Sequence, residues 1–286
     1  HGGEFKVSGD HFRGSLGRVW TSFQGSGSLA DTEPFSRGLL RGKSLHTESN
    51  YVFYHLYNPL WIRKGASVAV DRSQIFSQLN TEPGSTFEAN PYAVGGQLHY
   101  PYVVVTLDGN DSHVDGLLEG KFHLVLDSRR GKRHPKGFTF QKENDPQLNS
   151  GRNSILFLNN PENKIFAEGE TLVVNGVLEL AGAGSIGGGK VTVGAIKDED
   201  GFETGGGATL VASKTLEVPG KTEVKYGGML AAERGQALSF KDITVNMLKK
   251  MPNGKKMPGM FMINSTSPST SQDWSGTVEL GGEGRR

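Results

Sequence analysis

Aromatic side chains crowd into one short segment of this chain, residues 51–57, and another aromatic residue follows at Trp61. Successive side chains of an extended strand point to opposite faces, so a strand over this segment would carry rings on both faces. Such rings can stack on a sugar, or protein can cover both faces and bury them. Four residues are therefore candidates for ligand binding: Tyr51, Tyr54, Tyr57 and Trp61.

The same stretch contains side chains that could cleave a polysaccharide. Such an enzyme needs a base and an acid to move protons, and a cation to neutralise a uronate carboxylate. His55, Tyr57 and Arg63 are the candidate catalytic residues for these tasks, although nothing in their spacing singles them out. The histidines form neither an HExxH motif nor a pair four residues apart, so the sequence has no signature of a zinc hydrolase.

Oxygen-bearing side chains in residues 108–119 have a spacing that resembles a calcium-binding loop. An EF-hand loop needs glycine at its sixth position, where this sequence has His113, so that motif is excluded. A looser site requires only clustered oxygens, because Ca²⁺ is a hard cation. Calcium is thus the candidate cofactor, with Asp108, Asn110 and Asp115 as its ligands, and a polar hairpin loop without metal is the alternative.

The first residue offers a different metal chemistry. A histidine at an N-terminus can bind copper through its amine and its ring together with a second histidine, as in copper monooxygenases that cleave polysaccharide. His1 is therefore a candidate copper ligand. The alternative is a histidine that cloning or processing has left at this position.

Composition and motif context exclude several other functions. The chain has 31 basic and 30 acidic side chains, and a net charge of +1 creates no field that would attract nucleic acid. It has no cysteine, so a thiolate metal site is excluded. No run approaches the ~20 apolar residues that span a bilayer, so we expect no membrane span. Residues 182–187 match the GxGxxG dinucleotide fingerprint, but the sequence predicts a strand after them where a nucleotide site needs a helix.

Short strands are expected to position the candidate residues. Residues 51–57, 101–107 and 121–126 are rich in β-branched and aromatic side chains and end at turn-forming residues, which predicts three strands. The last two would bracket a loop at residues 108–120. Residues 71–80 are the exception, because Asp71 could cap a short helix with its apolar side chains on one side.

Glycine punctuates the part of the chain between Gly169 and Gly235, where short apolar pieces are separated by Gly or Asn-Gly. This pattern is typical of many short strands joined by tight turns. The pieces recur at spacings of six to eight residues, which favours a parallel β-solenoid, and an antiparallel sandwich is the alternative.

These patterns together predict an all-β protein in three parts. An aromatic-rich N-terminal β domain would occupy residues 1–145, and a glycine-rich solenoid-like or sandwich-like region would occupy residues 146–248. A tail rich in Met, Lys and Ser would follow at residues 249–286 and end in one last strand. The polar, turn-rich segment 143–153 marks the first boundary.

The glycine-rich part also resembles a known family. From Thr171 it reads TLVVNGVLELAGAGSIGGGKVTVG, and from Gly205 it reads GGGATLVASKTLEV. Over residues 165–245 these phrases resemble the β-solenoid passenger segments of bacterial autotransporters. The resemblance implies a stalk or spacer whose attached parts adhere to surfaces or cleave peptides. The sequence has no subtilisin-like or chymotrypsin-like nucleophile motif, so the protease role does not carry over to any residue here.

The function that the sequence favours is binding of a polysaccharide or of a cell-surface glycan or protein. The protein would be extracellular or on the cell surface, after secretion of the bacterial type. The alternative is a secreted polysaccharide lyase or hydrolase with its site in the N-terminal half, and copper-dependent oxidation at His1 is the third hypothesis. An enzyme should have titratable side chains that converge in one cleft, whereas a binding protein should present exposed rings without such a cluster.

Overall fold

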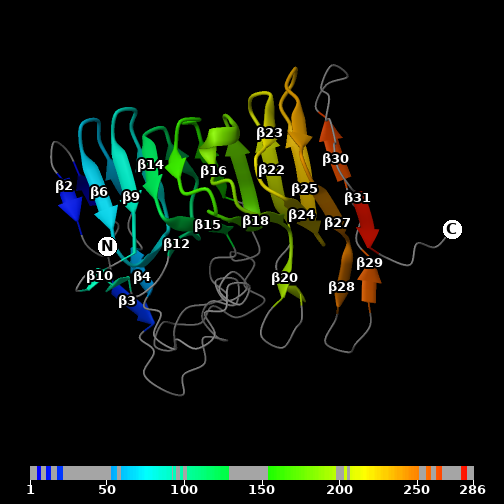
Figure 1. The fold of residues 1–286 in the computed structure, drawn as a ribbon, viewed down its shortest axis with the longest axis horizontal. Helices are drawn as coiled ribbons and strands as arrows, with labels where there is room; N and C mark the ends of the chain where they lie inside the picture. The colour runs from blue at the N-terminus through cyan, green and yellow to red at the C-terminus, as the bar shows by residue number, and fades with distance from the viewer. Residues whose placement is uncertain are drawn as a thin grey trace.

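Strands make up almost all of the regular structure among the residues that the structure describes. The computed structural model describes residues 5–7, 11–13, 18–21, 53–56, 59–91, 93–94, 97–98, 102–128, 154–197, 203–204, 207–250, 256–258, 262–265 and 278–281. Within these ranges the one helical element is a 3-10 turn of three residues, η3 (Ala183–Ser185). Figure 1 shows the strands following one another along the longest axis, from the N-terminal to the C-terminal end of the chain.

A first ladder of parallel strands runs the length of the molecule, and we call it the first ladder throughout. Each strand pairs with the next one in this order. The strands are β1 (Phe5–Val7), β5 (Leu60–Ile62), β8 (Leu79–Thr81), β13 (Ser112–Val114), β16 (Ile155–Leu158), β18 (Thr171–Leu180), β22 (Ala208–Ala212), β25 (Gly228–Ala232) and β30 (Met262–Ser265).

The second ladder runs beside the first and is parallel except at its start, where β3 (Arg18–Thr21) pairs antiparallel with β4 (Phe53–Leu56). From β4 onward each strand again pairs in parallel with the next. The further strands are β7 (Ser73–Phe76), β12 (Val103–Leu107), β15 (Phe122–Asp127), β18, β19 (Val191–Val193), β24 (Thr222–Lys225), β27 (Ile243–Asn246) and β31 (Val278–Gly281). The two ladders form one 18-stranded sheet.

A third, shorter ladder covers the N-terminal part of the stack. It joins β2 (His11–Arg13), β6 (Ser67–Val70), β9 (Thr86–Ala89), β14 (Leu117–Gly120) and β17 (Lys164–Ile165), all parallel. Farther along the chain, β23 (Leu216–Val218) and β26 (Leu238–Phe240) form a separate parallel pair. Three antiparallel pairs complete the described strands: β10 (Ala93–Val94) with β11 (Gln97–Leu98), β20 (Ile196–Lys197) with β21 (Glu203–Thr204), and β28 (Leu248–Lys250) with β29 (Lys256–Pro258).

The strand β18 belongs to both long ladders because it turns a corner at Gly176. Its first residues pair with β15 and β19, residues 177–180 pair with β16, and residues 176–180 pair with β22. Gly176 has φ of 111°, a conformation that side-chain-bearing residues rarely adopt. A Cβ at this position would also lie 2.8 Å from the carbonyl oxygen of Ser154. Glycine is therefore required at this corner.

In the strands β5, β13 and β16 of the first ladder, buried residues alternate with more exposed ones, which separates the core from the surface. The strands β7, β12 and β15 of the second ladder are instead buried at every residue. On the first ladder one register position faces inward and is leucine on most strands, and these side chains are at most 2% exposed. This column contains Leu60, Leu79, Leu156, Leu178, Leu210 and Leu230. Phe76 and Phe87 meet edge to face inside the same core, with ring centroids 5.5 Å apart. The apolar side chains of short pieces that are distant in sequence thus stack into one continuous core.

The predicted all-β character is correct, but the predicted fold class is wrong. The sequence patterns predicted an aromatic-rich N-terminal β domain followed by a solenoid-like or sandwich-like glycine-rich half. Instead, strands from both parts pair into one large, mainly parallel sheet, for example β13 with β16. The segment around residue 145 lies outside the described residues, so the domain boundary there stays a prediction.

Two local predictions are also wrong. Residues 71–80 form the strand β7 and the start of β8 rather than a helix, because Ile75 and Phe76 pair with strands on both sides. Residues 108–120 are not a simple loop between two strands, since they contain β13 and β14. The flanking strands β12 and β15 are parallel neighbours, so the predicted hairpin does not form.

Most predicted strands are confirmed. The segments 51–57, 101–107 and 121–126 contain β4, β12 and β15. After the glycines at 187–189 the chain enters the strand β19, as expected, and not the helix that a nucleotide-binding loop requires. The rejection of a dinucleotide-binding loop at this point therefore stands.

Candidate ligand-binding face

Two rows of side chains line the outer surface of the first ladder. The parallel pairs align the middle residue of each of the strands β5, β8 and β13 with Phe157 in β16 and with Glu179 in β18. We call this set the ring row: Trp61, Asn80, His113, Phe157 and Glu179. The residues that directly follow the strands β5, β8, β13 and β16 form a second set, the polar row: Arg63, Glu82, Asp115 and Asn159. Neighbouring strands are about 4.8 Å apart, so the rows are closely spaced.

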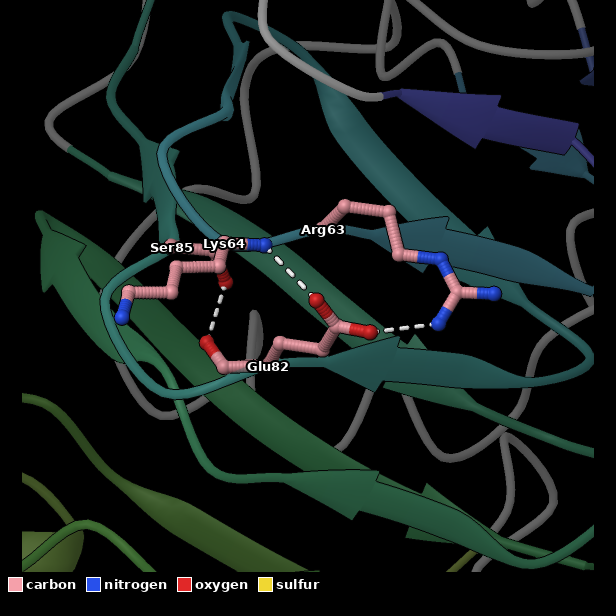
Figure 2. Close-up of polar contacts among 4 residues, drawn as sticks. All are labelled: Arg63, Lys64, Glu82 and Ser85. Atoms are coloured by element: carbon pink, nitrogen blue, oxygen red, sulfur yellow. Dashed lines mark hydrogen bonds and ion pairs between the residues drawn. The ribbon is translucent and has the colours of Figure 1, made fainter.

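One end of this face is organised around Glu82. Its carboxylate accepts a hydrogen bond from the guanidinium of Arg63 and another, of 2.8 Å, from the backbone N–H of Lys64. Figure 2 shows Glu82 between these two groups, while the hydroxyl of Ser85 donates to its backbone carbonyl. The bond from Lys64, followed by the bond from Arg63, lowers the pKa of Glu82. The carboxylate therefore stays ionised and holds the Arg63 side chain in place.

Arg63 in turn covers part of Trp61. The guanidinium carbon lies 5.0 Å from the centre of the Trp61 ring, within the range of a cation–π contact. The indole is half-exposed. A flat aromatic surface with a fixed cation above it thus begins the ring row.

Asn80, next to Trp61 in the row, is only 1% exposed. Its Oδ1 accepts a hydrogen bond of 3.0 Å from the backbone N–H of His113. This bond fixes the orientation of the amide, because only the oxygen can accept from an N–H donor. Asn80 therefore links β8 to β13 at the surface of the ladder.

The centre of the row is a ring stack. The rings of His113 and Phe157 are 4.4 Å apart between centroids and nearly parallel, at 11°. His113 is exposed and Phe157 is half-exposed, so the stack presents aromatic surface to solvent. Beside it in the polar row, the amide of Asn159 donates to the carboxylate of Asp115 over 2.6 Å.

Glu179 ends the ring row. It is half-buried, and burial raises its pKa; the negative charge of Glu233 raises it further, while the positive charge of His113 lowers it. The net result is a carboxyl group whose pKa is above its ordinary value. Such a group can hold a proton under mildly acidic conditions in which exposed glutamates are ionised.

The residues predicted from the sequence have different placements. Trp61 and Arg63 lie together on this face. Tyr54 and His55 belong to β4 on the second ladder, and nothing is described of their side chains. Tyr51, Tyr57 and His1 lie outside the described residues, so copper binding at His1 stays a prediction.

The candidate calcium ligands flank the strand β13. Asp108 precedes it and accepts a hydrogen bond of 3.4 Å from the hydroxyl of Ser77. Asp115 follows it and is bonded to Asn159. Asn110 is exposed. These contacts do not test calcium binding, which stays a prediction. Among the described residues, no group of three His, Cys, Asp or Glu side chains could hold a metal ion.

Asn80, Phe157 and Glu179 were not predicted as candidates, and His113 entered only as a departure from a calcium loop and among the histidines without a zinc motif. One signal could have found them. In the strand segments LWI, LNT, SHV, ILFL and the LEL of β18, the residue of the ring row lies between two residues that face the core. The type of the middle residue, rather than any spacing along the chain, marks the row.

A second cluster of rings lies in the interior and is not open to a ligand. Tyr102 and His123 are 5% and 1% exposed, and their rings meet edge to face at 3.9 Å. The Nδ1 atom of His123 accepts a hydrogen bond of 2.9 Å from the backbone N–H of Glu170. Burial, with a smaller contribution from the charge of Glu170, raises the pKa of Tyr102. We assign this cluster to packing.

Comparison of the chain with family models, with curated proteins and with solved structures gives no match. Across the described ranges we find no helix with the length and apolar character of a membrane span. The function has to be inferred from the geometry of the face itself.

Proposed function

We propose that this protein binds a carbohydrate through the ring row and the polar row of the first ladder. Sugars offer apolar C–H faces that pack on flat rings and hydroxyl groups that bond to amides and carboxylates. The ring row supplies half-exposed and exposed rings, and the polar row supplies charged and amide groups beside them. A polysaccharide or a cell-surface glycan would be the partner, and the extracellular or cell-surface location remains part of the proposal.

The observation that carries the proposal is the exposed stack of His113 on Phe157. Large apolar rings are usually buried, and a ring pair at the surface between polar groups is typical of binding surfaces. The stack is held on rigid parallel strands, so a ligand would not need to order it. Exposed rings are what the sequence-based hypothesis required of a binding protein.

The test is a glycan array of neutral and acidic oligosaccharides, probed with and without calcium. We expect binding to at least one glycan, and we expect Phe157→Ala and His113→Ala each to weaken it about three- to tenfold through loss of ring contact. Val211→Ala is the matched control, because Val211 continues the same register beyond Glu179 without a ring. Thermal unfolding of each variant checks the fold.

Two outcomes would contradict the proposal. One is an array on which no glycan binds. The other is glycan binding that neither ring variant changes. A requirement for calcium would in addition support the predicted site at Asp108, Asn110 and Asp115, and binding that is equal with and without calcium would count against a role for that site in binding.

A polysaccharide hydrolase is the second candidate, and Glu179 is the specific observation that favours it. A general acid in glycoside hydrolysis needs a carboxyl group with a raised pKa beside the bound sugar. Glu179 lies next to Phe157 in the ring row and has a raised pKa, mainly through burial. If this candidate is right, Glu179→Gln keeps sugar binding and abolishes product formation, as measured by chromatography of an incubated array ligand. Wild-type protein that binds the sugar but never shortens it would contradict the hydrolase hypothesis.

A further inference from the structure

Two buried hydrogen-bond donors lie side by side on the ring row without a partner. The atoms are Nε1 of Trp61 and Nδ2 of Asn80, and neither is hydrogen-bonded to any of the described residues. Buried polar atoms are nearly always hydrogen-bonded, and an unmade bond is costly. An acceptor for these two atoms has to come from outside the described residues, and a ligand atom that enters between the two side chains would supply it.

The positions of both donors are constrained. Trp61 and Asn80 are register partners on β5 and β8, so their side chains leave the same face of the ladder about 4.8 Å apart. The backbone N–H of His113 occupies Oδ1 of Asn80, which leaves the amide nitrogen as the group that needs an acceptor. The Arg63 guanidinium lies over the Trp61 ring and is held there by Glu82.

The chemistry of these groups selects the ligand. The indole N–H, the amide NH₂ and the guanidinium only donate hydrogen bonds. A sugar hydroxyl both donates and accepts, and the acceptor at this end of the face, the carboxylate of Glu82, is already bonded to Arg63 and Lys64. A carboxylate only accepts, and hydrogen bonds to an ionised group are shorter and stronger than neutral ones.

We infer that Trp61 and Asn80 receive the carboxylate of an acidic sugar, with the Arg63 guanidinium as the neighbouring cation. This inference rests on the proposed carbohydrate function and names the class of its ligand. The ring stack of His113 and Phe157 would hold an adjacent sugar unit of the same chain, because it lies next to Asn80 in the row.

Paired probes test the ligand class. Oligosaccharides of galacturonate, glucuronate and mannuronate are titrated calorimetrically at neutral pH, each against its carboxyl-reduced, neutral counterpart. We expect at least one acidic form to bind about tenfold more tightly than its reduced form, the effect of a charged hydrogen bond. Equal affinity within every pair overturns the inference.

Two variants locate the preference. Asn80→Asp keeps an oxygen for the His113 N–H but replaces the donor by an anionic acceptor, so the preference for the acidic form should disappear. Trp61→Phe keeps a ring and removes the N–H, so the same preference should fall while binding of the neutral form persists. Asn246→Asp, an exposed position at the end of β27 on the second ladder, adds the same charge elsewhere and should change nothing.

The outcomes separate this inference from the proposed function. If acidic and reduced forms bind equally and Phe157→Ala weakens both, carbohydrate binding stands and the carboxylate site is wrong. A preference for the acidic form that survives in both Asn80→Asp and Trp61→Phe also overturns the site. Failure of every probe to bind overturns the carboxylate site, and the neutral glycans of the array then decide the proposed function alone.

Discussion

At the scale of single residues, Gly176 shows how one position can decide the path of the chain. It lets β18 leave the second ladder and join the first, and both its positive φ and the nearby Ser154 carbonyl oppose any side chain. Asn175 and Gly176 form the one Asn-Gly pair of the 169–235 segment, which predicts a turn. The sequence does not show that the chain passes here from one ladder to the other, because that depends on contacts with other strands.

Gly176→Ala should destabilise the protein by more than the ~1–2 kcal/mol that a left-handed backbone conformation costs a side-chain-bearing residue. The excess comes from the clash with the Ser154 carbonyl oxygen. Chemical denaturation measures the loss. Gly65→Ala is the control: Gly65 also has positive φ, 80°, but a Cβ there meets no atom within 4 Å, so only the conformational cost should remain. Equal losses in the two variants would show that the Ser154 contact is unimportant.

At the scale of elements, charged side chains stabilise the outer face of neighbouring strands where apolar residues are absent. Glu223 in β24 is flanked by Lys190 and Lys225, and both form ion pairs with its carboxylate. Burial alone would raise the pKa of Glu223, but the hydrogen bonds and charges of the two lysines outweigh it and lower the pKa. A carboxyl with a lowered pKa in the folded state stabilises the fold above the ordinary glutamate pKa, and this contribution disappears as the pH falls through the folded pKa.

Glu223→Gln should therefore lower the free energy of unfolding at pH 7 by about 0.5–1 kcal/mol, the usual scale for partly exposed ion pairs. The difference from the wild type should shrink as the pH falls from the ordinary glutamate pKa of about 4.3 through the lowered pKa of the folded state, where the wild-type carboxyl becomes protonated too. Urea denaturation over a pH series measures this. Glu217→Gln is the control, since the pair of Glu217 with Lys241 is more exposed. A loss at Glu223 that is the same at every pH would contradict the electrostatic explanation.

At the scale of the whole molecule, the ladders have a beginning, a middle and an end. The antiparallel strand β3 covers the first edge of the second ladder, which reduces the number of open backbone groups there. In the middle, β15, β16 and β18 have partners on both sides. At the far end β30 and β31 each pair with one described strand, β25 and β27.

This arrangement predicts a gradient of amide protection. Hydrogen exchange followed by mass spectrometry should show slow exchange in β15, β16 and β18 and fast exchange in β30 and β31, because opening an edge strand breaks fewer contacts. Peptides from β5 and β8 provide an internal reference, since both strands are paired on two sides. Protection of β30 and β31 equal to that of β18 would indicate that another segment or another molecule covers this edge.

The sequence by itself determined where most strands lie, because that information is local. The β-branched and apolar pieces between turn residues predicted β4, β12 and β15 and the strands after the glycines. The local sequence pattern wrongly predicted a helix at residues 71–80, because Asp71 and three apolar residues fit a helix equally well over so short a span. Only pairing with β4 and β12 makes the segment a strand.

The tertiary structure alone decided which strands are neighbours, and with them the candidate site. Contacts across the face join residues that are 19, 33 and 44 positions apart in the chain, as in Arg63 with Glu82, Asn80 with His113, and Asp115 with Asn159. These separations follow no fixed period, because segments of unequal length connect successive strands of the first ladder. A side chain's type can be recognised from local sequence, but its neighbours in a parallel stack are set by the register of distant segments, which only the packed core selects.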